Sequence, residues 1–401
     1  MKIIHTGDWH IGKIVNEFSM IEDQKYILNK LVELIKEEKP DVLVIAGDVY
    51  DRSIPPVEAV ELLNKVFEEI LIDNGVKILA IAGNHDSAER LAFGSSILEK
   101  NGLYIVGDIE NEFKKVVISK EDKNFNFFLI PYIEPVVLRK KYDDKNIKNH
   151  NDAMKFIVNK IKNEMDNSEI NVVVAHGYVT LNRDKALGCS DEDKYKAAEI
   201  EVSESERPLS IGGTDLIDGN IFNEFDYVAL GHLHGRQKVG KNSIRYSGSL
   251  LKYSFSEVNH KKGATIIEVN DKDDMIIRNQ EIEPIRDMRV IRGHLDDLIE
   301  AARESEEGRD DYIQAILTDE GELVDPIGKL RAVYPNIMLL RKEEKNVTLN
   351  SLTAASAGYK NKSEIELFKE YYERLGDGEF SKEKEDVMIS VIEEALREEK
   401  L

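Results

Sequence analysis

Five short segments of this 401-residue chain place a residue that can bind a metal ion directly after an apolar run. The segments are HTGDWH (5–10), AGDVYD (46–51), AGNHD (82–86), VVAHG (173–177) and GHLH (231–234). The side chains in them that suit metal binding or acid–base chemistry are Asp8, His10, Asp48, Asn84, His85, His176, His232 and His234. Any one such segment is most often an ordinary surface pair, but five in succession at the ends of apolar runs indicate one shared site.

Imidazole and carboxylate groups together suit manganese, iron or zinc, with coordination positions left open for water. Seven or eight ligands are too many for one ion, so the set predicts two ions about 3.5–4 Å apart that share an aspartate. Side chains alternate along a strand, so His232 and His234 lie on the same side of the chain, where each could ligate a different ion. Asn84 and His85 are adjacent, so we do not expect both to face the same ion.

The elements that must position these residues follow from the hydrophobic periodicity. Short apolar runs at 2–5, 42–47 and 77–83 are typical of buried parallel strands, and helices are predicted between them, with a further helix over 86–102. More strands are predicted at 125–131, 171–177, 226–232, 243–249 and 264–269. We therefore expect an α/β fold, a layered two-sheet domain flanked by helices, whose strand ends line one ligand crevice.

The pattern changes near residue 285. Segments 288–293, 295–305, 312–319, 325–333 and 336–342 follow a β-α-β-α-β order, which predicts a small separate α/β domain. A polar stretch after it indicates a linker, and two charged amphipathic segments at 364–376 and 382–400 indicate helices. The predicted organisation is a main domain at 1–284, a small capping domain at 285–344, a linker at 345–363 and terminal helices at 364–401.

The composition sets limits on the class of protein. The 55 basic and 77 acidic residues give a net charge of −22, which by itself argues against nucleic-acid binding. Bound divalent metals or a partner could supply the missing positive charge. No apolar run is long enough for a membrane span, the N-terminus has no signal pattern, and the one cysteine, Cys189, fits a reducing compartment. We expect a cytoplasmic protein.

The order D-x-H, G-D-x-x-D, G-N-H-D, H-G and G-H-x-H resembles the calcineurin-like metallophosphoesterase superfamily. Longer stretches resemble the members of it that serve as nuclease subunits beside an SbcC-type ATPase. These are HTGDWHIGK, GDVYDRSIPP, SESERPLSIGGTDLID, FDYVALGHLHG and IRYSGSLLKYSFSE. The resemblance covers the whole chain, although only residues 1–270 carry specific motifs. One departure is Gly7, where the bacterial pattern more often has serine.

The resemblance implies two divalent ions per chain, with manganese expected. One ion would be held by Asp8, His10, Asp48 and His234, and the other by Asp48, Asn84, His176 and His232. His85 would act near the leaving group, as a general acid or a stabiliser of the transition state. The activity implied is that of a DNA nuclease, a double-strand 3′–5′ exonuclease and single-strand endonuclease, in repair, recombination and replication at the nucleoid.

The resemblance also implies partners. The chain has no P-loop, so any ATP dependence must come from the SbcC-type ATPase, which the terminal helices would bind. Helices at 56–73 and 87–100 would pair across a two-fold axis to give a homodimer, and thus a heterotetramer with the ATPase. Their candidate apolar residues are Val57, Val60, Leu63, Phe67, Leu91, Ile97 and Leu98.

DNA contacts are harder to assign, because a single basic residue is more often a solvated surface charge. The candidates near the motifs are Lys13, Arg52, Arg90, Arg207, Arg236 and Lys252. Two other functions stay open at this point. The chain could be another calcineurin-like phosphoesterase, acting on nucleotides or phosphoproteins, or a non-catalytic scaffold that tethers DNA ends.

Overall fold

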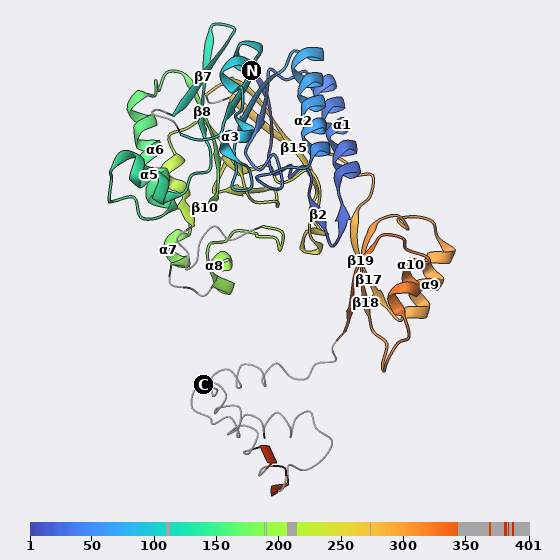
Figure 1. Cartoon of the computed structure of the whole chain (residues 1–401). Helices are drawn as coiled ribbons and strands as arrows, with labels where there is room; N and C mark the ends of the chain where they lie inside the picture. The colour runs from blue at the N-terminus through green and yellow to red at the C-terminus, as the bar shows by residue number, and fades with distance from the viewer. Residues whose placement is uncertain are drawn as a thin grey trace. The chain divides into compact units, whose positions relative to one another are not determined.

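The computed structural model describes residues 1–109, 113–187, 189, 191–206, 215–272 and 274–343, with isolated residues beyond 368. The chain divides into two compact units, 1–341 and 342–401; Figure 1 colours it by residue number. The linker expected at 345–363 and the helices expected at 364–376 and 382–400 lie outside the described residues, apart from those isolated positions. The first unit contains all eight candidate ligand and acid–base residues.

The first sheet has six strands in the order β16-β15-β1-β4-β5-β6. Their bounds are β1 (Lys2–Thr6), β4 (Val42–Ile45), β5 (Lys77–Ile81), β6 (Leu103–Val106), β15 (Gly263–Asp271) and β16 (Asp274–Glu281). β1, β4, β5 and β6 run parallel, as helical crossovers between them require. The crossovers contain α1 (Ile21–Glu38), α2 (Val57–Glu68) with a π-helical turn (Glu69–Asp73), α3 (Ala88–Leu91) and α4 (Ser95–Leu98).

The second sheet also has six strands, in the order β13-β14-β12-β9-β8-β7. Their bounds are β7 (Lys114–Lys120), β8 (Lys123–Ile130), β9 (Ile170–His176), β12 (Tyr227–Gly231), β13 (Gln237–Val239) and β14 (Lys241–Tyr246). The four central strands are parallel and the two edge strands antiparallel. Helices α5 (Pro135–Tyr142) and α6 (His150–Glu164) connect β8 to β9.

Smaller elements extend from this frame. After β9 the chain forms β10 (Tyr178–Thr180), α7 (Arg183–Ala186), α8 (Asp191–Ala197) and β11 (Leu216–Asp218), with β10 and β11 paired in parallel. Near the N-terminus, β2 (Ile14–Val15) and β3 (Phe18–Ser19) form a short antiparallel pair.

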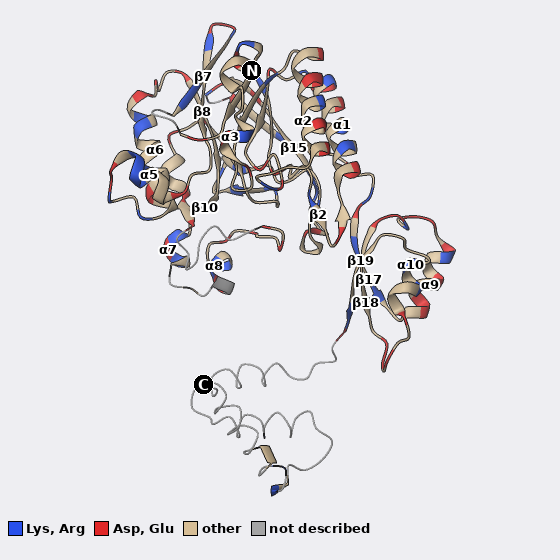
Figure 2. Ribbon diagram, in the orientation of Figure 1, with Lys and Arg blue, Asp and Glu red and all other residues tan. Residues whose placement is uncertain are grey.

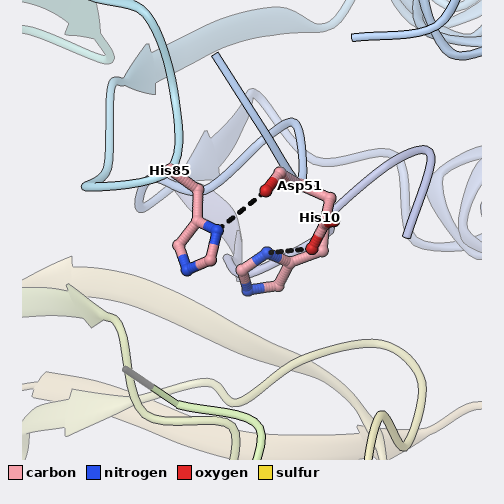
Figure 3. A group of neighbouring side chains, drawn as sticks. All are labelled: His10, Asp51 and His85. Atoms are coloured by element: carbon pink, nitrogen blue, oxygen red, sulfur yellow. Dashed lines mark hydrogen bonds and ion pairs between the residues drawn. The ribbon is translucent and has the colours of Figure 1, made fainter. Parts of the chain in front are cut away.

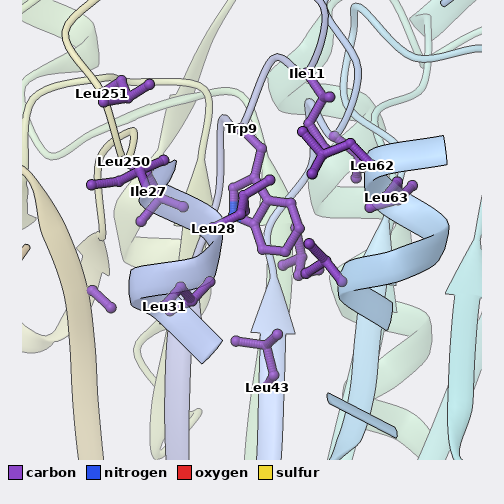
Figure 4. Close-up of a cluster of buried hydrophobic side chains, with 14 of the residues drawn as sticks. Trp9, Ile11, Ile27, Leu28, Leu31, Leu43, Leu62, Leu63, Leu250 and Leu251 are labelled. Carbon is purple, nitrogen blue, oxygen red and sulfur yellow. The ribbon is translucent and has the colours of Figure 1, made fainter. Parts of the chain in front are cut away.

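Three apolar clusters define the layers of the main domain. One lies between the sheets, where Val44 of β4 and Leu79 of β5 pack with Val172 of β9. A second covers the outer face of the first sheet beneath α1 and α2, and Figure 4 shows Trp9 at its centre. The third packs α6 on the outer face of the second sheet through residues such as Ile157. The layered two-sheet fold with helices outside, expected from the sequence, is confirmed.

The segment after residue 285 has its own small sheet in the order β17-β18-β19. Its elements are β17 (Met288–Gly293), α9 (Leu295–Glu304), β18 (Tyr312–Leu317), α10 (Pro326–Arg331) and β19 (Ile337–Lys342). A separate apolar cluster joins the helices to the sheet. The buried Asp23 of α1 links this subdomain to the main domain, because it accepts hydrogen bonds from Tyr312 at 2.7 Å and Arg286 at 2.9 Å.

Two local predictions were wrong. The single helix expected over 86–102 is broken into α3, α4 and a 3₁₀ turn, because Gly94 adopts a left-handed φ of 73° that ends the first piece. No helix was predicted between 131 and 170, where α5 and α6 lie. The periodicity is weak in α5, but in α6 the apolar residues Met154, Ile157, Val158 and Ile161 fall at helical spacing, so the sequence held a signal that was missed.

Candidate metal centre

Each candidate residue lies at or directly after the carboxyl end of a strand. Asp8 and His10 follow β1, Asp48 follows β4, Asn84 and His85 follow β5, His176 ends β9, and His232 and His234 follow β12. All of them are buried except Asn84, which is half-buried. The structure therefore brings all eight together, because the parallel strands of each sheet present their carboxyl ends at one edge.

Direct contacts join the strand ends of the two sheets. The backbone N–H of His232 donates to Asp8 Oδ1 at 2.9 Å, and His176 Nδ1 lies 2.8 Å from the carbonyl oxygen of Ala46. Gly231 approaches the first sheet so closely that a Cβ on it would lie 1.8 Å from that same carbonyl oxygen. Glycine is therefore required at the start of GHLH for the two sheets to meet.

Four of the candidate residues have a left-handed backbone. The φ angles are 54° at Asp8, 45° at His10, 49° at Asp48 and 107° at His232. This conformation is sterically unfavourable for residues with a Cβ and persists only where the surrounding structure enforces it. Here it turns the chain sharply at each strand end, and such strain concentrates at functional sites.

The ligand atoms form two groups that share Asp48. In the first, atoms of Asp8, His10 and Asp48 lie within 4.8 Å of one another, and His234 Nε2 is 3.0 Å from His10 Nε2. In the second, atoms of Asp48, His176 and His232 lie within 4.8 Å of one another. Asn84 joins this second group.

Asn84 Oδ1 contacts both histidines of the second group. It lies 3.0 Å from His176 Nε2 and 2.9 Å from His232 Nδ1. His176 Nε2 is in turn 3.5 Å from Asp48 Oδ2. The side chains thus form two neighbouring groups that share Asp48.

The residues fit a pair of divalent cations. One buried carboxylate oxygen of the cluster, Asp8 Oδ2, has no hydrogen-bond partner. Burial without a partner is costly for a polar atom, and a cation would compensate it. The imidazole, carboxylate and amide donors are those that transition-metal sites with open positions use.

The electrostatics favour neutral rings at three of the four histidine ligands. At the fourth, His176, burial lowers the pKa, but Asp48 outweighs burial and raises the pKa to about 9. Burial lowers the pKa of His10 and His232 well below the usual value, and it also lowers the pKa of His234. Burial alone would raise the pKa of Asp48, but His176 and the other nearby histidines hold it well below its usual range. The shared aspartate is therefore ionised and these three rings have lone pairs to donate.

His85 lies beside the cluster and is held by two contacts (Figure 3). Its Nδ1 lies 2.8 Å from the backbone carbonyl oxygen of Asp51, so Nδ1–H is the donor. Its backbone N–H donates to Asp48 Oδ1 at 2.9 Å, and its ring meets that of His10 edge-on at 4.7 Å. The Nε2 atom is left as the nitrogen that can exchange a proton with a substrate.

Sequence reasoning missed Asp51 as a member of this cluster. Atoms of His10, Asp51 and His85 lie within 4.8 Å of one another. Asp51 Oδ1 also accepts a hydrogen bond from Lys13 Nζ at 2.7 Å. The signal was present, because Asp51 ends the quoted stretch AGDVYD. Its carboxylate is 12% exposed, less buried than that of Asp48.

A second missed group lies behind His234. The Ser205 hydroxyl donates to Glu257 Oε1 at 2.6 Å and lies 2.8 Å from His234 Nδ1, so it accepts from Nδ1–H. Lys262 Nζ donates to Glu257 Oε2 at 2.6 Å, and Glu206 Oε1 accepts the backbone N–H of His234 at 2.5 Å. The group fixes the tautomer that leaves His234 Nε2 free to bind a metal.

The candidate DNA contacts are in different environments. Lys13 is buried against Asp51, and Lys252 pairs with Asp287 at 2.8 Å. Arg52 and Arg90 are exposed, Arg236 is half-buried, and Arg207 lies outside the described residues. The charges of Lys13 and Lys252 are therefore already compensated within the chain.

Comparisons with known proteins agree with this geometry. The model of the calcineurin-like phosphoesterase family matches residues 1–236, and that of the type 5 capsule protein repressor C-terminal domain matches 284–375. A curated relative, the SbcD subunit of nuclease SbcCD from Staphylococcus epidermidis, is 34% identical over 387 residues, which cover 96% of each chain. No helix in the described part of the chain is long and apolar enough to cross a membrane.

Two solved structures are also similar, but too distantly to support an argument. A dimetal phosphatase from Danio rerio has a TM-score of 0.39 and 13% identity, covering 71% of this chain and 98% of that one. The NAD nucleotidase of Haemophilus influenzae has a TM-score of 0.34 and 10% identity, covering 90% and 67%. The family match and the full-length relative together decide the assignment: this chain belongs to the calcineurin-like phosphoesterases, in the SbcD family of phosphodiester hydrolases.

Proposed function

We propose that this chain is the metal-dependent nuclease subunit of a complex with an SbcC-type ATPase. It hydrolyses phosphodiester bonds of DNA during the processing of ends and hairpins in repair, recombination and replication, in the cytoplasm at the nucleoid. The finer activity is that of a double-strand 3′–5′ exonuclease and single-strand endonuclease. The observation that carries the proposal is the pair of buried ligand groups sharing Asp48, with His85 fixed beside them.

Two divalent ions per chain, with manganese as the metal, complete the site. Asp8, His10, Asp48 and His234 hold one ion, and Asp48, Asn84, His176 and His232 hold the other. When bound, the ions supply positive charge for the scissile phosphate and increase the acidity of water. Metal analysis of the manganese-reconstituted protein should give two ions per chain, and a firm stoichiometry of one would contradict the two-ion site.

His85 is the catalytic residue that serves the leaving group. Its Nδ1 donates to the Asp51 carbonyl oxygen, so the ring is fixed in orientation and presents Nε2. A protonated Nε2 can donate to the departing sugar oxygen, whereas a neutral one can position it. Because the backbone of His85 is anchored on Asp48 Oδ1, the ring keeps its place relative to the shared ligand.

Each domain has its own proposed role. Residues 1–284 form the nuclease domain and 285–344 a capping domain that contacts DNA. Residues 345–363 are a linker to terminal helices at 364–401, which bind the ATPase. The capping elements pack on α1 through Asp23, a contact that supports a fixed position beside the nuclease domain.

A homodimer is the proposed form of the nuclease, and thus a heterotetramer with the ATPase. Exposed apolar side chains on and around α2 to α4 support it. Exposed fractions are 69% for Val57, 85% for Phe93 and 73% for Ile97, which are high values for large apolar side chains. Leu63, Phe67 and Leu91, which were predicted to belong to this surface, are instead buried in the outer cluster of the first sheet.

The experiment that tests the function is cleavage of a duplex with blocked ends, with manganese, in the presence and absence of the ATPase. Cleavage should require the metal, and the ATPase with ATP should stimulate it. A chelator gives the matched control. Lack of cleavage of any DNA by the metal-loaded chain and by its complex would overturn the proposal.

The same assay separates the two alternatives. A phosphatase for nucleotides or phosphoproteins would release phosphate from those substrates and leave DNA intact. A scaffold would bind DNA ends without metal-dependent cleavage. The intact ligand groups argue against a scaffold, because tethering alone needs none of the strained backbone at Asp8, His10 and Asp48.

A further inference from the structure

A groove of about 680 Å³ lies at the edge of the second sheet, directly after the metal centre in sequence. The charged side chains that line it are Lys196, Glu199, Glu201, Arg236, Lys238 and Arg245. Arg236 follows His234 by two residues, and Lys238 and Arg245 face each other in register across β13 and β14. In a chain with a net charge of −22, four basic residues in one groove are an exception.

Arg245 is a buried cation without a counter-ion. Its side chain belongs to a residue only 7% exposed. Nη1 and Nη2 donate to the amide oxygens of Asn242 and Asn279, each at 3.2 Å, whereas Nε has no hydrogen-bond partner. Among the described residues no carboxylate forms an ion pair with it. A charge removed from water in this way is unfavourable unless an opposite charge joins it.

Arg236 adds a second guanidinium, which is half-buried and also has an N–H group without a hydrogen-bond partner. Its Nη2 donates to the carbonyl oxygen of Lys261 at 2.7 Å, but Nη1 is buried without a partner. Burial lowers the pKa of Arg236. The charge of Glu281 raises it and that of Arg245 lowers it, and the net effect is a lowering. Both guanidinium groups line the same groove, so an anion bound there would meet two positive charges.

The carboxylates that line the groove do not neutralise these arginines. Glu201 Oε1 lies 2.9 Å from His260 Nε2, and Glu199 Oε1 lies 3.3 Å from Lys185 Nζ. Both acidic groups thus have other basic partners in the part of the chain that the structure describes. The unpartnered donors of the groove match a ligand that is anionic and rich in acceptor oxygens.

We propose that Arg236 and Arg245 form a phosphate subsite, which binds the DNA backbone beyond the cleaved bond. The inference rests on the proposed nuclease function and names the residues that hold its substrate. Guanidinium groups bind phosphate oxygens through their N–H donors, and Arg245 Nε and Arg236 Nη1 are buried donors that no protein acceptor satisfies. Because Arg236 directly follows the GHLHG segment, a phosphate bound there extends the strand whose scissile phosphate lies at the metal centre.

The first experiment uses inorganic phosphate and the metal-free protein in a chelator, where the metal centre offers no cations. At constant ionic strength, phosphate should raise the Tm of the wild-type chain in a saturable way, and chloride should not, because a ligand that binds only the native state stabilises it. Arg236→Gln should remove the effect. Lys241→Gln is the matched control, because Lys241 is exposed on the same hairpin and does not line the groove.

The second experiment measures binding of a short DNA to the metal-free full chain by fluorescence anisotropy over a range of salt concentrations. Loss of one phosphate contact should reduce the slope of log K against log salt by about one, in Arg236→Gln and not in Lys241→Gln. Arg245→Lys keeps the buried charge and should fold, yet it loses the open Nε and should weaken binding several-fold.

The outcomes separate this inference from the function it rests on. Equal salt slopes and no phosphate-dependent Tm in the wild type would overturn the subsite even if the chain cleaves DNA. Phosphate stabilisation with unchanged DNA slopes would also overturn it, in favour of a site for free phosphate or nucleotides. Failure of nuclease activity with manganese would instead refute the proposed function, whatever the phosphate result.

Discussion

At the scale of single residues, two histidines of the site each use one ring nitrogen for a hydrogen bond within the protein. His85 uses Nδ1 for the Asp51 carbonyl oxygen, and His234 uses Nδ1 for Ser205, so in each ring only Nε2 remains for chemistry. A histidine whose second nitrogen is fixed in this way has one tautomer and one orientation. The roles of the two rings can therefore be separated by mutation.

His85 should be needed for cleavage and not for metal binding. His85→Asn keeps a side-chain N–H near the position of Nδ1 but lacks Nε2, and His85→Leu lacks both. Each variant should bind manganese almost as the wild type does, while nuclease activity falls by about 10²–10⁴-fold, the range for a positioned acid. Calorimetric metal titration beside the nuclease assay checks this. Loss of metal together with activity would show that His85 is a ligand.

Ser205 should act through His234 as a positioning residue. Ser205→Ala removes the acceptor of His234 Nδ1–H, and loss of such a contact behind a metal ligand costs about 10–100-fold in metal affinity. Calorimetry should show weaker binding of one ion and unchanged binding of the other, with recovery in Ser205→Thr. Ser203→Ala is the control, because this hydroxyl is buried in the same segment and has no hydrogen-bond partner. Two unchanged affinities in Ser205→Ala would refute the role.

At the scale of elements, the break in the helix expected over 86–102 has a consequence. The left-handed Gly94 separates α3 from α4, and the neighbouring Phe93 and Ile97 are left exposed. One continuous helix would have turned part of that apolar surface toward the sheet. Phe93 and Ile97, with Val57 of α2, are the exposed apolar residues assigned to the proposed homodimer.

Charge introduced on this surface should dissociate the dimer. The wild type should scatter light as twice 45.7 kDa at micromolar concentration, and Phe93→Glu should shift the mass toward that of one chain. A buried, unpaired carboxylate is strongly unfavourable in an interface core. Val324→Glu is the control, since Val324 is 80% exposed but belongs to the capping domain. A wild-type mass of one chain would contradict the dimer.

At the scale of the whole molecule, the net charge of −22 is unfavourable for binding the proposed DNA substrate, which is itself an anion. Many of the acidic residues lie on the outer helices α1, α2 and α9, where Figure 2 shows them in red. The ATPase partner can supply basic surface that this chain lacks. Binding to DNA ends is therefore expected to depend on the complex more than on the isolated nuclease.

Truncation after Lys345 should separate nuclease activity from binding to the ATPase. The variant keeps the first compact unit, 1–341, so manganese binding and cleavage of single-stranded DNA should remain largely intact. It lacks the terminal helices, so co-purification with the ATPase and ATP-stimulated cleavage of duplex ends should be lost. The helices proposed for 364–401 would be too small to form a core of their own and would need a docking partner. Full co-purification of the truncated chain would locate the interface elsewhere.

The sequence by itself determined the layered α/β fold and the positions of the eight site residues at strand ends. These follow from local rules, because strand periodicity and the parallel βα pattern depend on neighbours along the chain. The family resemblance went further and sorted the ligands into two sets, a sorting with which the distances around Asp48 agree. What the sequence could name was thus the residue types and their common location.

Only the tertiary structure decided how the two sheets meet and what surrounds the ligands. The His232 N–H reaches Asp8 across 224 positions of sequence, and Ser205 joins His234, 29 residues away, to Glu257, 52 residues away. The left-handed angles at Asp8 and His232 and the unpartnered guanidinium of Arg245 likewise depend on packing between distant segments. No local pattern encodes such contacts, because each exists only once the two sheets have packed together.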